Sequence, residues 1–139
     1  MAGAVLLDAL ILEKYFFDVK SFDIGRKSSG KKIKLALLTD LHFKQNLLPH
    51  HRKLATKLNQ INPDLLLIAG DTLDSSGSME PVKSFFSLLN QSIKKVSIPG
   101  NNDYKASAGI DTLEQVLQKY NCYFLVNESK AYTWLWPWC

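Results

Sequence analysis

Three polar clusters in this 139-residue chain contain the residue types that bind divalent metal ions. Carboxylate and amide oxygens, together with an imidazole, suit hard or borderline ions. Each cluster is short, and each follows an apolar run of the sequence. The clusters read Asp40-Leu41-His42, Gly70-Asp71-Thr72-Leu73-Asp74 and Gly100-Asn101-Asn102-Asp103.

The apolar runs before the clusters have the length and composition of buried strands. They cover residues 33–39, 65–69 and 96–99, and Lys34 is the only charged residue among them. A nearly continuous apolar run is typical of a strand that is buried on both faces. Ligands of open α/β sheets bind outside the carboxyl ends of the strands. Three polar clusters at that position therefore predict a single convergent site.

Each cluster alone also fits ordinary loop chemistry. Asp40 could cap the next helix, Gly70 permits a tight bend before a turn, and Gly-Asn-Asn-Asp is a favoured turn sequence. As a site, the same residues place Asp71 where a carboxylate could bridge two ions. Asp74 could then orient one of the metal ligands without itself binding an ion. The order of all three clusters, each after an apolar run, favours a metal site over three unrelated loops.

Two other motifs are interpreted as structural. Residues 25–31 match most of a phosphate-binding loop, but Lys32 stands where Ser or Thr must bind magnesium, and a strand follows where a helix is required. His50 and His51 lie at an expected helix start, where a histidine pair is more often exposed. We therefore include neither motif in the predicted site.

The elements that would position the clusters alternate between strand and helix. We expect an edge strand at 15–22 and core strands at 33–39, 65–69, 96–98 and 123–126. One helix begins near Pro49 and ends at Asn62-Pro63, and a second begins at Pro81. A third has Asp111 as its N-cap and ends near Asn121. This alternation is typical of βαβ units and a parallel sheet.

Composition indicates one soluble globular domain over residues 1–139. Apolar residues make up 46% and charged residues 22% of the chain. The net charge of +4 comes with a basic run at 26–34 that lacks interleaved aromatic residues, so no nucleic-acid partner is expected. Two cysteines are too few for a disulfide framework and fit a reducing compartment.

The two ends of the chain differ from the rest. Residues 1–12 predict a helical lead-in, which is too short to span a bilayer and lacks the features of a signal peptide. Residues 132–139 form an atypical apolar tail that holds all three tryptophans. This unpatterned tail favours a truncated domain or a shifted reading frame.

The three clusters resemble those of the calcineurin-like metallophosphoesterases in order and spacing. The family pattern is Asp-x-His, Gly-Asp-x-x-Asp and Gly-Asn-His-Asp or Glu. The lead-in to Asp40 is similar to that of a bacterial, often membrane-associated branch, which includes enzymes acting on lipid-linked pyrophosphates. The resemblance covers only the N-terminal half of the family domain. It implies an α/β fold in which βαβ units form one sheet with helices, half of a four-layer α/β/β/α sandwich.

The resemblance also implies roles for individual residues. Asp40 and His42 would hold a first metal, Asp71 would bridge both metals, and Asn101 would hold the second. The cofactors would be two divalent ions, with Mn, Fe or Zn as the expected metals. Asn102 and Asp103 would complete the catalytic set. Asp74 would support the metal ligands without contacting the ions.

Two departures from the family pattern affect the expected activity. Asn102 replaces the family histidine that is thought to protonate the leaving group or steady the transition state. An asparagine can donate a hydrogen bond but cannot act as a general acid. The later histidine motifs, which would complete both metal sites, are absent from the sequence.

The function expected from this resemblance is metal-dependent hydrolysis of phosphomonoester, phosphodiester or pyrophosphate bonds through a dinuclear centre. The substrate would be a phosphate ester, nucleotide- or lipid-linked. The expected location is cytoplasmic, with peripheral association at the inner face of the membrane as an option. The alternative is a catalytically incomplete fragment that acts as a binding partner or as a metal-independent phosphate-binding module. Substrate, metal identity and oligomeric state stay open at this point.

Overall fold

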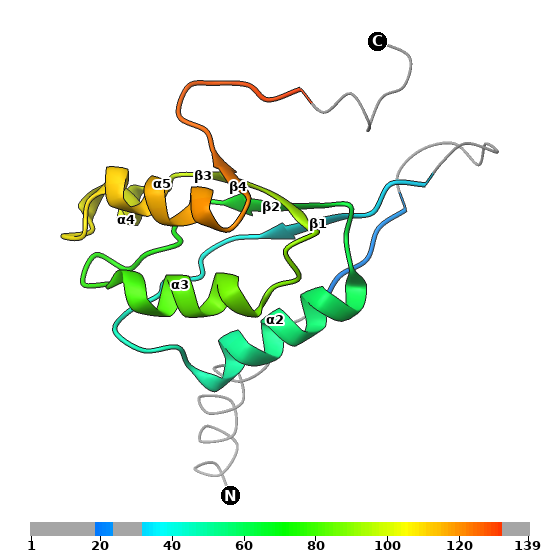
Figure 1. Ribbon diagram of the computed structural model, residues 1–139, viewed down its shortest axis with the longest axis horizontal. Coiled ribbons are helices and arrows are strands. Elements are labelled where there is room, and N and C mark those ends of the chain that lie inside the picture. The colour runs from blue at the N-terminus through cyan, green and yellow to red at the C-terminus, as the bar shows by residue number, and fades with distance from the viewer. Residues whose placement is uncertain (1–18, 24–31, 132–139) are drawn as a thin grey trace, which may run out of the picture.

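The computed structural model describes residues 19–23 and 32–131, and it has a mixed α/β architecture (Figure 1). Strands and helices alternate along most of this part of the chain, as the sequence predicts. The elements are β1 (Leu35–Leu38), α2 (Pro49–Ile61), β2 (Leu65–Ala69), α3 (Met79–Leu88), β3 (Lys94–Ile98), α4 (Asn101–Lys105), α5 (Ile110–Lys119) and β4 (Cys122–Phe124).

The four strands form one parallel sheet in the order β1-β2-β3-β4. Leu37 pairs with Leu67, Leu67 with Val96, and Val96 with Tyr123. Parallel strands need a crossover between them, and α2, α3 and α5 provide these crossovers. The predicted α/β fold of βαβ units is confirmed.

One face of the sheet and the helices α2, α3 and α5 enclose the hydrophobic core (Figure 1). Leu66, Ile68 and Phe124 point from the strands into this core, and Phe85 and Leu117 meet them from the helices. Removing such side chains from water contributes about 25 cal/mol of folding free energy per Å² of buried apolar surface. This burial keeps the strand ends, and therefore the polar clusters, in a fixed arrangement.

The first strand is less buried than its sequence predicts. We expected burial on both faces, but Leu35 and Leu37 are 56% and 67% exposed. The strand lies at the edge of the sheet with β2 as its partner, and only its alternate residues Ala36 and Leu38 pack against the core. On the same face Ile98 is also exposed at the end of β3, whereas Leu65 and Val96 are buried.

The helix boundaries follow the predicted signals with small shifts. Pro49 is the first residue of α2, and Asn62 ends it in the left-handed conformation at φ 45°. Helix α3 begins at Met79, two residues before the predicted Pro81, because the whole first turn tolerates a residue without an N–H. Gly109 rather than Asp111 is the N-cap of α5, and Asp111 lies in the first turn.

The third strand starts two residues earlier than predicted and includes a buried lysine. The Lys95 side chain is fully buried, and its Nζ donates hydrogen bonds to the carbonyls of Ile93 and Tyr120, at 2.7 and 3.1 Å. Two carbonyl acceptors compensate for the loss of water around the amine. Burial lowers the pKa of Lys95.

Several predictions lie outside the described residues. These are the helical lead-in at 1–12, the phosphate-loop-like segment at 25–31 and the apolar tail at 132–139. Most of the expected edge strand at 15–22 lies outside as well, and its described part, residues 19–22, forms no strand. Within the described ranges, no helix is long and apolar enough to cross a membrane.

Candidate metal centre

The loops that follow β1 and β2 are tied together beyond the end of the sheet. The N–H of Asp40 donates to the Gly70 carbonyl, and that of His42 donates to the Asp71 carbonyl, at 3.3 and 3.0 Å. Phe43 extends the pairing by donating to the carbonyl of Thr72 at 2.9 Å. These backbone bonds continue the parallel pairing and bring the first two clusters to the same edge.

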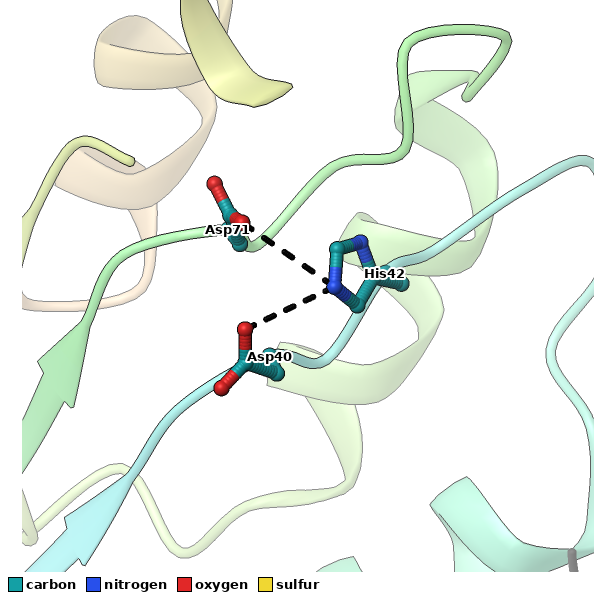
Figure 2. A group of neighbouring side chains, drawn as sticks. All are labelled: Asp40, His42 and Asp71. Carbon is teal, nitrogen blue, oxygen red and sulfur yellow. Dashed lines mark ion pairs between the residues drawn. The ribbon is translucent and has the colours of Figure 1, made fainter. Parts of the chain in front are cut away.

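Three of the predicted ligands meet at this edge (Figure 2). One ligand atom from each of Asp40, His42 and Asp71 lies within 4.8 Å of the other two. The Nε2 of His42 is 3.5 Å from Oδ1 of Asp40 and 4.0 Å from Oδ2 of Asp71. Because metal–ligand bonds are about 2.0–2.2 Å long, two ligands of one ion lie at most about 4.4 Å apart. The donor set therefore fits a divalent ion after side-chain shifts of a few tenths of an ångström.

All three predicted ligand residues have left-handed backbone conformations. Their φ angles are 56° at Asp40, 45° at His42 and 51° at Asp71. Asp and His tolerate this region better than most residues, but it still costs on the order of 1–2 kcal/mol each. Such strain clusters at functional sites. The same conformation occurs outside the site at Asn62, Asn121 and Asn127, so it is compatible with both a metal site and a turn.

The carboxylate of Asp71 is held by Asn102. Its Oδ1 accepts the backbone N–H of Asn102 at 2.9 Å, and its Oδ2 accepts the Asn102 side-chain amide at 2.8 Å. These two hydrogen bonds, the backbone one first, lower the pKa of Asp71. Asp71 is therefore ionised at neutral pH, as a metal ligand must be.

The second and third clusters approach each other through glycines. A Cβ on Gly100 would lie 2.1 Å from Oδ1 of Asp71, which is far inside van der Waals contact. Gly70 has a φ of 83°, and a Cβ there would lie 2.9 Å from the Cα of Gly100. Only glycine allows the loops to pack this closely.

Asp103 connects the same two loops through its carboxylate. The residue is fully buried, and its Oδ1 accepts the N–H of Leu73 at 2.7 Å, while its Oδ2 accepts the N–H of Gly100 at 2.8 Å. Both oxygens of the carboxylate therefore bind backbone groups of the second and third clusters. The contacts of Asp103 are with the loops that carry the site.

The carboxylate of Asp74 organises its own loop. Its Oδ1 accepts hydrogen bonds from the N–H and the hydroxyl of Ser76, at 3.1 and 2.8 Å. These bonds, the backbone one first, lower the pKa of Asp74. Lys44 Nζ lies 4.0 Å from its Oδ2. The charge of His42 also contributes to lowering this pKa, and the role of Asp74 behind a metal ligand stays a prediction.

The third cluster forms a short helix, and not the turn that its composition also allowed. Asn101 is the first residue of α4, and it is exposed at the same edge as Asn102. Gly100 before the helix and Asp103 in its first turn are start signals that the turn-like composition concealed. The role of Asn101 as a ligand stays a prediction.

The prediction that His51 is exposed was wrong. Its residue surface is only 4% exposed, and its ring contacts Phe43 edge-on with a centroid separation of 4.5 Å. The Nδ1 of His51 accepts the N–H of Leu48, the N-cap of α2, at 3.3 Å. Its position three residues after the N-cap is where a capping box places Glu or Gln, a signal that could have indicated this role.

Burial, followed by the charge of His50, lowers the pKa of His51 to about 4, and a hydrogen bond to the Leu41 backbone opposes this shift. His51 is therefore neutral at physiological pH. Neither His50 nor His51 belongs to the group of close ligand atoms among the described residues.

Comparison with known proteins gives a consistent result. A family model described as calcineurin-like phosphoesterase matches residues 33–139. An uncharacterized metallophosphoesterase of Campylobacter jejuni is 32% identical over 117 residues, which cover 81% of this chain and 30% of that protein. An uncharacterized metallophosphoesterase of Helicobacter pylori is 35% identical over 115 residues, or 79% of this chain and 30% of the relative. The chain thus spans less than a third of the length of the relatives it matches.

Proposed function

Because the chain belongs to the calcineurin-like phosphoesterase family, we propose that it carries the metal-binding edge of a phosphoesterase. The reaction is hydrolysis of a phosphomonoester, phosphodiester or pyrophosphate bond at a dinuclear divalent metal centre. The observation that carries this proposal is the convergence of Asp40, His42 and Asp71 at the carboxyl ends of β1 and β2.

The ligand assignment within this proposal is the one that the family resemblance implies, and the closeness of Asp40, His42 and Asp71 supports it. Asp40 and His42 would hold the first ion, Asp71 would be shared between both ions, and Asn101 would bind the second. Ions bound there would supply electrostatic stabilisation of the phosphoryl group and would lower the pKa of water. The mixed oxygen and nitrogen donors suit Mn, Fe or Zn.

The residues around the ligands hold them ready for binding. Asn102 fixes both oxygens of Asp71, so the carboxylate loses little rotational freedom when an ion binds. Asp103 holds the loops of the second and third clusters together. We assign a positioning role to Asp103 and Asp74, since their carboxylates contact the loops.

The proposed substrate is a phosphate ester that is either nucleotide-linked or lipid-linked. Asp40 is 59% exposed at its side chain, so a phosphate can reach the edge from solvent. A cytoplasmic location, with peripheral attachment to the inner face of the membrane, is also kept as a proposal.

Hydrolysis of bis(p-nitrophenyl) phosphate with added Mn²⁺ tests the proposed activity. We expect Asp71→Asn to lower the rate by roughly 100-fold or more, because an amide is a poor bridging ligand. Asp111→Asn removes the same charge from the exposed first turn of α5 and serves as the matched control. Retention of the full Mn²⁺-dependent rate by Asp71→Asn would contradict the assignment.

A second candidate function is binding without catalysis. The exposed apolar side chains of Leu35, Leu37 and Ile98 on one face of the sheet favour this candidate. A chain that covers 30% of its relatives could then complete a metal site with another polypeptide. Size-exclusion chromatography separates the candidates, because a compact monomer with Mn²⁺-dependent activity excludes an obligate binding role. Phosphate binding in the presence of EDTA would instead indicate a metal-independent phosphate-binding module.

A further inference from the structure

We propose that His51 is a positioning residue of the metal centre, which holds the loop carrying Asp40 and His42 in place through Leu41 and Phe43. The inference rests on the proposed function, because it assigns His51 to the support of that site. It concerns a residue that lies in helix α2 and outside the three polar clusters.

The first contact is with the ring of Phe43. This ring is fully buried between His51, at a centroid separation of 4.5 Å, and Phe85, at 5.2 Å. The backbone of Phe43 joins the two ligand loops, since its N–H donates to Thr72 and its carbonyl accepts from Asp74, at 2.9 and 3.0 Å. The ring contacts therefore fix the residue that immediately follows His42.

The second contact is with the peptide between the two ligands. His51 hydrogen-bonds to the backbone of Leu41, and its Nδ1 accepts the N–H of Leu48 at the start of α2. Leu41 is itself buried, so water cannot replace this bond easily. The bond connects the helix start to the strained segment in which Asp40 and His42 adopt positive φ angles.

A neutral imidazole meets all these requirements at once. It supplies an acceptor, a donor and an aromatic edge from one flat ring. An apolar side chain of similar size would keep the packing but would leave the groups of Leu48 and Leu41 without this partner. The ring centroids of His50 and His51 are 4.0 Å apart, and both residues lie in helix α2. Substitution of His50 therefore offers a matched control.

The test is titration of Mn²⁺ into the full chain by isothermal calorimetry, with the metal alone as probe. We expect His51→Leu to weaken Mn²⁺ binding by roughly 10-fold or more. This is the usual size of the effect when a residue that supports a metal ligand is replaced. His51→Gln, which can keep one polar contact, should lose less, and His50→Gln should stay within about twofold.

Hydrogen exchange supplies a readout that does not need the metal. In His51→Leu, we expect faster exchange of the amides of His42 and Phe43, which bond to the second loop, without a comparable change in β3. Faster exchange throughout the sheet would indicate a general loss of stability and would overturn the positioning role.

Each remaining outcome is also decisive. A folded His51→Leu variant with unchanged Mn²⁺ affinity would overturn the inference. If that variant does not fold, a double-mutant cycle of His51→Gln with Phe43→Leu replaces it, and additive effects on Mn²⁺ affinity would count against the proposal. If the wild-type chain binds no Mn²⁺, the proposed function fails, and unchanged exchange at His42 and Phe43 would separately overturn the role of His51.

Discussion

Asn102 holds both carboxylate oxygens of Asp71, one through its backbone N–H at 2.9 Å and the other through its side-chain amide at 2.8 Å. Asn102 occupies the position of the histidine in the family pattern, yet here the side chain supports a predicted metal ligand. An amide cannot deliver a proton to a leaving group. The proposed reaction therefore depends on leaving groups that depart without general-acid assistance.

Replacing this amide by an imidazole should change substrate preference. We expect Asn102→His to raise the Mn²⁺-dependent rate about 10-fold more for phenyl phosphate than for p-nitrophenyl phosphate, because general-acid catalysis matters most for poor leaving groups. Steady-state rates on the two substrates check this, with Asn102→Gln as the control. An equal change on both substrates would show that the imidazole does not act as an acid.

Gly100 should tolerate no side chain. In Gly100→Ala, the new Cβ would meet Oδ1 of Asp71 at 2.1 Å, so the loops must separate. We expect the free energy of unfolding to fall by about 2–3 kcal/mol and Mn²⁺ binding to be lost. Gly109→Ala is the control, since its φ of 81° costs about 1 kcal/mol while its surroundings are open. Urea unfolding and calorimetry measure both quantities, and unchanged Mn²⁺ binding in Gly100→Ala would contradict the prediction.

Asp103 should contribute to stability through its charge and its shape. Asp103→Asn keeps the size of the side chain but points an NH₂ group at the N–H of Leu73 or Gly100. We expect a loss of about 2–3 kcal/mol in the free energy of unfolding, because a buried donor then lacks its acceptor. Asp111→Asn, which is exposed, should stay within about 0.5 kcal/mol. Equal unfolding midpoints for the two variants would show that the Asp103 bonds are dispensable.

The stability of the protein should depend on pH through His51. Its pKa in the folded state is about 4, below the ordinary value of 6.5, because burial and His50 disfavour the charged form. The unfolded chain therefore binds a proton first as the pH falls from 6.5. The resulting stabilisation is complete above pH 6.5, and it is lost progressively down to about pH 4.

The loss is on the order of 3 kcal/mol across this window. Urea unfolding at several pH values measures it against His51→Phe, which cannot titrate. We expect a shallower pH dependence for the variant. Parallel curves for both proteins would show that another group is responsible.

The sequence predicts the positions of the strand ends well but the surroundings of the strands poorly. The clusters around Asp40 and Asp71 follow apolar runs, and backbone pairing alone brings such ends together. Periodicity cannot distinguish an edge strand from a central one, so the exposure of Leu37 was missed.

The supporting residues were missed for a different reason. The contact of His51 with Phe43 and the bond of Asp103 to Leu73 join segments that are distant in sequence or belong to different elements. A local pattern carries the identity of such residues but not their partners. Lys95 is the same case, because a lysine just before an apolar run gives no sign of the two carbonyls that accept its hydrogen bonds.

The strand order in the sheet equals the strand order along the chain. This determines the order in which the strands can pair during synthesis. Each new strand finds its partner already made, so no pairing waits for a distant segment to leave the ribosome. Asp40, His42 and Asp71 are all translated once the second strand is complete. The supports from Gly100 to Asp103 arrive about thirty residues later, after the third strand. A nascent chain would therefore hold the three predicted ligands before it holds the residues that fix Asp71 and the loops around it.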